Sequence, residues 1–231
     1  MVWSTPGPKP LSGISNSPKM TTLLEVIGQD NINAIRRNIA ANRINSVYTI
    51  LEARWYHKNL CLKDIISFNY DWNKPYIVGF RTARSAVNRL SDLLDRPDYE
   101  WIDRYYQNPE RYDGKKARDV LFLMKHVIYG LGMILLELQK GYQLVSNAEV
   151  AARFSNVKED KYMPALEKFA RAGDGRLGKD FGDPIICCLR GSEGVAYQFD
   201  DLETQTKPLS EFKRRVVDRV GVQDASPFSL K

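Results

Sequence analysis

Apolar residues in the first half of this chain recur at intervals of three and four, the spacing of one face of an α-helix. Between residues 31 and 59 they form two stripes: Ile32, Ile35 and Ile39, then Ile44, Val47, Tyr48, Leu51 and Trp55. A third stripe consists of Phe80, Ala83, Val87, Leu90 and Leu94. It predicts an amphipathic helix that ends at Arg96, because the residue before a proline avoids the helical region.

The most apolar segment of the chain opens the second half, and we expect it to form a helix over 115–140. It is apolar nearly all round, as is typical of a helix buried in a core. Its charge-free centre, 127–136, is much shorter than the roughly 20 residues that a membrane span needs. Gly130 and Gly132 mark points of close packing against a neighbouring element, and Gly141 is a natural C-cap.

Two capping-box patterns predict helix starts. They are Thr22 with Glu25, where ordered structure should begin, and Ser146 with Glu149, where a helix should open. Further helices are predicted over 98–106, 159–172 and 208–220, with a loop over 173–183. Two β-prone runs, 185–189 and 195–199, flank a glycine-containing turn and predict a small β-hairpin near 185–199.

Together these elements predict a mainly α fold, a compact bundle-like helical domain with one small hairpin and flexible termini. Residues 1–20 are rich in proline and poor in charge, so they are expected to form a flexible N-terminal arm. Residues 21–221 are expected to form a single helical domain, divisible into an N-lobe, 21–112, and a C-lobe, 113–221. Residues 222–231 are predicted to be a loose C-terminal tail.

Composition allows a soluble protein with a polyanionic partner but does not require that partner. Of the 231 residues 43% are hydrophobic, enough for a core, and the net charge is +6. Cys61, Cys187 and Cys188 make a poor disulfide framework, and with only two histidines they make a poor zinc set. We therefore expect no metal, no cofactor and an intracellular, reducing compartment. The N-terminus lacks a signal-peptide pattern and no membrane insertion is expected.

Cations and aromatic rings are interleaved most densely between residues 54 and 118. Flat rings beside cations suit a single-stranded nucleic acid, whose bases stack and whose phosphates pair with arginine. The arginines expected to contact phosphates lie in two runs free of carboxylates and are Arg36, Arg37 and Arg43, then Arg81 and Arg84. The rings expected to be exposed and to stack on bases are Tyr70, Trp72 and Tyr76.

A glycine-rich loop carries the pattern G-x-G-x-x-G at Gly173, Gly175 and Gly178. The dinucleotide-binding form of this motif needs a strand before it and a helix after it, and here a helix is predicted before it. The match is therefore interpreted as chance. A weaker hypothesis remains, that Arg176 and Lys179 close over a phosphate backbone from this loop.

Signals for catalysis are weaker. Acidic residues over 180–203 could converge on a metal ion, yet no spacing among them defines a pair. His126 is interpreted as a core residue of the long apolar helix. The cations Lys213, Arg214, Arg215 and Arg219 are accompanied by Glu211 and Asp218 and are interpreted as a solvated helical face.

These observations predict a non-catalytic protein that binds single-stranded RNA and self-associates through its termini, in the manner of a viral nucleocapsid or capsid subunit. This expectation comes from general design, since no single motif carries it. One alternative is a helical adaptor or regulator that binds another protein through its rings. A second alternative is a metal-dependent phosphoesterase or nuclease that uses the acidic loops.

Overall fold

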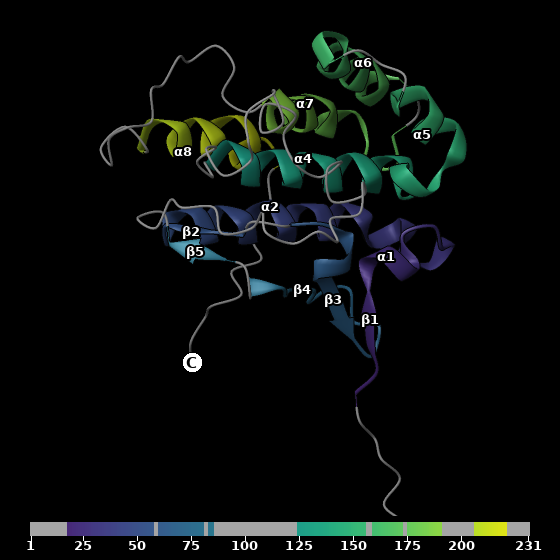
Figure 1. The fold of residues 1–231 in the computed structure, drawn as a ribbon. Coiled ribbons are helices and arrows are strands. Elements are labelled where there is room, and N and C mark those ends of the chain that lie inside the picture. Colours follow the sequence, from purple (N-terminus) through teal and green to yellow (C-terminus); the bar gives the residue numbers. More distant parts are fainter. Residues whose placement is uncertain are drawn as a thin grey trace, which may run out of the picture.

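The computed structural model describes residues 18–57, 60–80, 83–85, 124–155, 159–172, 175–190 and 206–220. These residues form a mainly helical protein with a small antiparallel sheet, as the sequence pattern predicts. Figure 1 shows helices α4 (Met124–Lys140), α7 (Gly182–Arg190) and α8 (Thr206–Phe212) above helix α2 (Arg36–Glu52), with the small strands below α2. The helices predicted over 86–123 lie outside the described residues.

Helix α4 is the centre of the core. Every residue from Met124 to Gln139 is buried except Lys125, so the helix has no face suited to water. It packs on α2 from one side and on α7 from the other. Its last turn ends at Gly141, whose φ of +80° and N–H bond to the carbonyl of Glu137 confirm the predicted C-cap.

Helix α1 (Leu23–Val26) begins where the sequence predicts, but a strand that was not predicted, β1 (Met20–Thr22), precedes it and includes Met20 of the expected arm. The predicted capping box is present between Thr22 and Glu25. The Glu25 N–H donates to the hydroxyl of Thr22 at 3.3 Å, and the Thr22 N–H donates to the Glu25 carboxylate at 2.9 Å. A 3-10 helix, Asp30–Ile35, then delivers the chain to α2.

Two small sheets lie beneath α2. Strand β1 pairs antiparallel with β3 (Ile65–Phe68), and β3 pairs antiparallel with β4 (Tyr76–Ile77). The register places Met20 opposite Phe68. Strand β2 (Trp55–Tyr56) pairs with β5 (Arg84–Ser85), so the helix predicted from Phe80 is wrong at its start. Strands this short leave too little alternation for a sequence pattern to reveal them.

The predicted hairpin near 185–199 is wrong in its first half. Residues 185–189 belong to helix α7, where Ile185, Ile186, Cys188 and Leu189 are buried, and 191–199 lie outside the described residues. A short apolar run fits a buried strand and a buried helix equally well, and here the contact with α4 decides for the helix. The second half of the predicted loop is also ordered, because Lys179–Phe181 form a 3-10 turn that leads into α7.

The remaining helices follow the prediction closely. Helix α5 (Ala148–Ser155) is capped by Asn147, whose side-chain oxygen accepts the N–H of Val150 at 3.1 Å, in place of the predicted Ser146. Helix α6 spans Glu159–Arg171. After α8 the chain continues as a π-helix, η10 (Lys213–Val217), and ends in α9 (Asp218–Val220). Among the described helices, none has the length and apolar character that crossing a membrane requires.

Gly132 sets the spacing between α4 and α7, which confirms the close packing predicted for this glycine. A Cβ atom added there would lie 2.9 Å from Cβ of Cys188 and 3.0 Å from the backbone nitrogen of Leu189. We expect Gly132→Ala to lower the free energy of unfolding by roughly 1–3 kcal/mol, because two helices must move apart. Urea unfolding followed by circular dichroism measures the change.

Gly182→Ala is the matched control for this prediction. Gly182 begins α7 with ordinary helical angles, and a Cβ atom there would meet nothing within 4 Å. The control should leave stability unchanged or slightly raised, since alanine favours a helix. Equal stability losses in the two variants would contradict the role assigned to Gly132.

Candidate functional site

Two of the arginines expected at an accessible surface lie in the core instead. Arg36 is 0% exposed and Arg43 is 3% exposed. They share one face of α2, as their spacing predicts, but that face is the buried one. Burial lowers the pKa of each guanidinium to about 10, and the nearby Arg176 adds to the effect on Arg36. The expectation that these two side chains face a polymer is therefore wrong.

The buried guanidinium of Arg36 joins three parts of the fold through oxygen acceptors. Its Nη2 donates to the carbonyl of Ile27 at 2.5 Å, and its Nη1 lies 3.4 Å from the carbonyl of Leu138. Its Nε donates to the side-chain oxygen of Asn33 at 2.9 Å. Arg43 similarly donates to the carbonyl of Pro75 at 2.6 Å. Backbone carbonyls thus serve these cations in place of the carboxylates that the sequence run lacks.

The three rings expected to be exposed divide in the same way. Trp72 is 2% exposed and belongs to the core, so that expectation is wrong for it. Tyr70 and Tyr76 are exposed, at 45% and 51%. The Nζ atom of Lys19 lies 5.1 Å from the ring centroid of Tyr70, and the ring of Tyr76 meets the ring of Phe68 edge-on at 5.7 Å.

The second predicted arginine cluster is only partly visible. Arg84 lies on strand β5, but its side chain is outside the described part of the structure. Arg81 lies outside the described residues altogether. Their expected contacts with phosphates stay predictions.

The glycine-rich loop and the start of α2, two separate predictions, meet in the structure. Arg37 pairs with Asp180 at 3.1 Å, and its guanidinium lies 5.6 Å from the ring centroid of Phe181. Arg176 donates to the side chain of Asn33 at 3.3 Å. Lys179 is exposed on the 3-10 turn that carries Asp180. The structure therefore brings Arg37, Arg176 and Lys179 into one region.

Packing accounts for the described glycines of this loop. A Cβ atom on Gly175 would lie 2.5 Å from the side-chain nitrogen of Gln139, and Gly178 has a φ of +89°. The backbone N–H of Arg176 also donates to the carbonyl of Gln139 at 3.0 Å. The loop is hydrogen-bonded to the end of α4, and its described glycines are explained by packing and backbone angle. This agrees with the interpretation of the glycine motif as a chance match.

Among the described residues, cations also gather around a hollow between α7 and the C-terminal helices. This arginine hollow has a volume of about 370 Å³. It is lined by Asp183, Ile186, Cys187 and Arg190 of α7 and by Arg214, Arg215 and Arg219 of η10 and α9. The α7 residues are spaced by three and four and so share one face. The π-helix η10 packs on α7 and contributes Arg214 and Arg215 to the hollow, and π-helical turns are frequent at functional sites.

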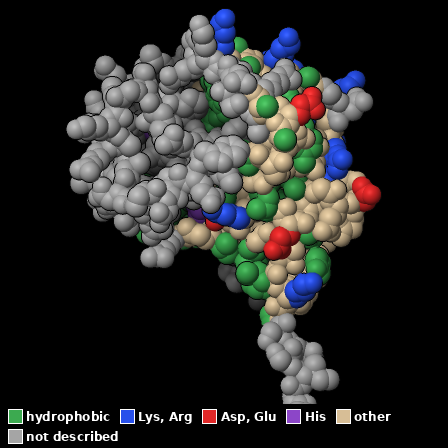
Figure 2. Space-filling view, turned by 45° about the vertical axis from the view of Figure 1, so that its right-hand side comes forward, with side chains coloured by type: hydrophobic (Ala, Val, Ile, Leu, Met, Phe, Trp, Pro, Cys, Tyr) green, Lys and Arg blue, Asp and Glu red, His purple; other side chains and the backbone are tan. Residues whose placement is uncertain are grey.

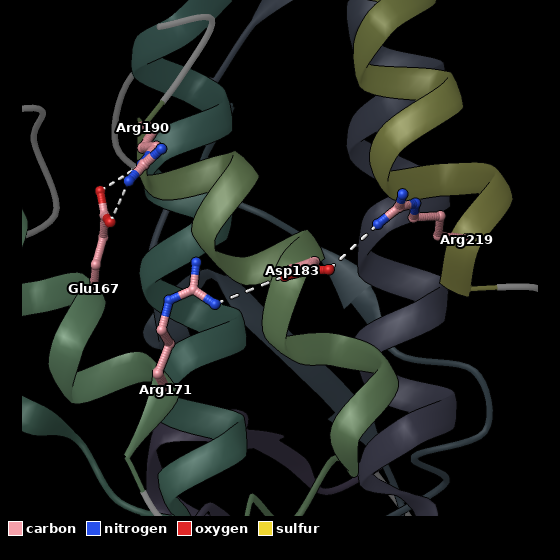
Figure 3. Close-up of polar contacts among 5 residues, drawn as sticks. All are labelled: Glu167, Arg171, Asp183, Arg190 and Arg219. Atoms are coloured by element: carbon pink, nitrogen blue, oxygen red, sulfur yellow. Dashed lines mark hydrogen bonds and ion pairs between the residues drawn. The ribbon is translucent and has the colours of Figure 1, made fainter.

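Carboxylates hold the arginines of the hollow in a network. Arg190 makes a bidentate pair with Glu167 of α6 at 2.5 and 2.6 Å, and Asp183 lies between Arg171 at 3.9 Å and Arg219 at 3.5 Å (Figure 3). Glu211 pairs with Arg214 at 2.7 Å and also with Arg215. Hydrogen bonding from Arg214 lowers the pKa of Glu211 to about 2, so this carboxylate stays ionised.

Positive charge exceeds negative charge in this network. The five arginines Arg171, Arg190, Arg214, Arg215 and Arg219 face the three carboxylates Glu167, Asp183 and Glu211. Each guanidinium carries five N–H donors, so together they offer more than three carboxylates can accept. The guanidinium groups can bind an oxyanion such as phosphate through one or two of its oxygens at a time.

Nucleophilic and metal chemistry find little support in the described residues. Burial raises the pKa of the Cys187 thiol in the hollow and of Cys188 behind it, so both stay protonated. His57 is buried, with Nε2 2.7 Å from the carbonyl of Val78, and His126 is buried in α4. Within the ranges that the structure describes, no three acidic, cysteine or histidine residues gather as metal ligands do.

Sequence reasoning missed the arginine hollow for one reason. Arg190 follows the run 185–189, and only a helical run places it on the same face as Asp183. Arg214, Arg215 and Arg219 were interpreted as a solvated face because Glu211 and Asp218 accompany them; their side chains are indeed exposed, but they also lie opposite α7. A helical periodicity of charge through 183–190 was the signal that could have revealed it.

Comparison with known proteins does not assign the chain to a family. No family model matches the chain, and no curated protein is significantly similar to it.

The burial of Arg36 beside the exposure of Arg37 gives a direct test of the corrected assignment. We expect Arg36→Ala to lower the free energy of unfolding by roughly 2–4 kcal/mol, because it leaves buried carbonyls without donors. Arg37→Ala, the neighbouring control, removes an exposed pair and an exposed cation's contact with the Phe181 ring, and should cost about 1 kcal/mol or less. Urea unfolding measures both, and similar losses would contradict the structural role of Arg36.

Proposed function

We propose that this chain binds single-stranded RNA through the arginine hollow and acts as a non-catalytic, self-associating coat protein of the viral nucleocapsid or capsid type. The observation that carries the proposal is the excess of arginine over carboxylate around the hollow. Guanidinium groups match phosphate oxygens in geometry and charge.

The existing ion pairs do not oppose such binding strongly. Arg219 and Asp183 have side chains that are 56% and 69% exposed, and their atoms are 3.5 Å apart. Exposed pairs of this kind contribute only about 0–1 kcal/mol. A phosphate can therefore replace Asp183 as the partner of Arg219 or Arg171 at little cost, and condensed cations released from the polymer favour the exchange.

The size of the hollow favours a single strand. A volume of about 370 Å³ corresponds to the sites that hold one small organic ligand. We infer that it takes the backbone of one extended nucleotide at a time. The cluster of Arg37 and Lys179 borders the hollow, because the 3-10 turn that carries Lys179 and pairs with Arg37 leads into α7 and packs on α9. This cluster offers a continuation for the next phosphates.

Charge reversal in the hollow tests this function. We expect the double variant Arg215→Glu/Arg219→Glu to lose at least tenfold in affinity for a labelled oligouridine, because two phosphate contacts become repulsive. The slope of log affinity against log salt should fall by roughly 1 to 1.5. Fluorescence anisotropy over a salt series measures both, with duplex RNA and oligothymidine as competing ligands.

The matched control is Lys63→Glu/Lys74→Glu, which reverses two exposed charges near the small sheet, far from the hollow. It should leave most of the affinity and the slope in place. Wild-type protein without salt-sensitive binding, or equal losses in both double variants, would remove the hollow from the model. Stronger binding to duplex RNA would overturn the preference for a single strand.

Asp183 should act as a competing anion within the site. We expect Asp183→Asn to raise the affinity for oligouridine about threefold, because phosphate no longer displaces a carboxylate from Arg171 and Arg219. Asp218→Asn changes the net charge equally from an exposed position that does not line the hollow and should have a smaller effect. A fall in affinity for Asp183→Asn would show that this carboxylate positions the arginines instead.

A further inference from the structure

The small sheet lies on the other side of α2 from α7 (Figure 1). An exposed row of apolar and aromatic side chains crosses this sheet. We call it the aromatic face and define it by Met20, Phe68, Tyr70 and Tyr76, all exposed. Met20 and Phe68 are opposite partners in the β1–β3 pair, and Phe68 meets Tyr76 at 5.7 Å, so the row spans all three strands. Hydrophobic side chains reach the surface at this lower end of the body (Figure 2).

A hydrogen-bonded turn after β3 fixes the position of Tyr70 on this face. Asn69 and Tyr70 have φ of +53° and +60°, and the N–H of Asp71 closes the turn on the carbonyl of Phe68 at 3.0 Å. A left-handed conformation costs a side-chain-bearing residue about 1–2 kcal/mol. Lys19 offsets this cost, because its backbone exchanges hydrogen bonds of 3.0 and 2.8 Å with Asn69. The chain therefore enters the fold at the edge of the aromatic face.

Residues 1–17, which precede the first strand, have a composition suited to covering the aromatic face. Residues 1–17 carry one charged side chain, Lys9, and hold the run Pro6-Gly-Pro8-Lys-Pro10 beside Trp3 and Leu11. Proline-rich segments can bind to aromatic rings in an extended conformation at low entropic cost. Residues 6–17 reach about 37 Å when extended at 3.1 Å per residue, far enough to meet a neighbouring molecule.

We propose that the aromatic face binds the proline-rich N-terminal segment of a second copy of this chain, so that copies join head to tail. The inference rests on the self-association in the proposed function and gives it a surface. Such a contact is heterologous, so it produces rings or filaments, as a coat along a strand requires. It does not use the elements that form the arginine hollow, because α7 and the small sheet lie on opposite sides of α2 (Figure 1).

Two variants and their mixture test this contact. The segment variant is Pro6→Ser/Pro8→Ser/Pro10→Ser, and the face variant is Phe68→Ala/Tyr76→Ala. In sedimentation velocity without RNA, the wild type should form larger species as concentration rises, and each variant alone should stay monomeric. An equimolar mixture should form a dimer, because the intact segment of the face variant can bind the intact face of the segment variant.

A control and a fold check accompany the mixture. Trp55→Ala removes a ring of similar exposure, 49%, from strand β2 outside the aromatic face, and it should leave assembly unchanged. The circular dichroism spectrum and the melting temperature of the face variant show whether it is folded. An unfolded face variant is replaced by Tyr76→Ser alone, which should weaken assembly by at least tenfold.

The outcomes separate this inference from the proposed function. Assembly that persists in the segment variant, or a mixture that stays monomeric, overturns the segment-on-face contact alone. A wild type that stays monomeric at every concentration, with and without oligouridine, overturns self-association as well. Loss of oligouridine affinity in the face variant, with assembly intact, would assign the face to base stacking. RNA binding through the hollow is read separately by anisotropy.

Discussion

The whole arrangement depends on a helix with no polar face. Helix α4 is buried almost from end to end, so other elements must cover it on every side. Helix α2 covers one side and α7 the other, and Gly132 lets α7 approach to contact distance. Once α7 is held there, its remaining face meets η10 and α9, and the arginine hollow forms between them. The core thus determines where the surface chemistry lies.

Buried arginine shows how an unpaired charge in a sequence can have two meanings. The run from Arg36 to Arg43 contains no carboxylate, a pattern that indicates a polyanionic partner. In the fold, Arg36 and Arg43 donate to backbone carbonyls at the ends of helices and turns, where oxygen acceptors are already available. Asn33 links this buried set to the surface, because its oxygen accepts from both Arg36 and Arg176. Only Arg37 of the run remains exposed.

The two surfaces proposed to bind partners, the arginine hollow and the aromatic face, lie in different layers of the fold. The arginine hollow belongs to the upper helices and the aromatic face to the small sheet, with α2 between them (Figure 1). The cations around the hollow come from residues 171–219 and the aromatic face from residues 20–76, so different parts of the chain supply the two surfaces. Such a separation suits a subunit that holds a polymer on one side and a neighbouring subunit on the other.

Sequence alone determined the features that depend on a few neighbouring residues. The capping box at Thr22, the helical stripe of α2, the span of α6 and the C-cap at Gly141 follow from local hydrogen bonds and periodicity. Tertiary structure decided whether 185–189 is a helix. A short apolar run fits a buried strand and a buried helix equally well, and the contact with α4 favours the helix. It also decided which arginines are buried, since Arg36 meets Leu138 across 102 positions of the chain. Burial depends on contacts between distant segments, and no local pattern contains them.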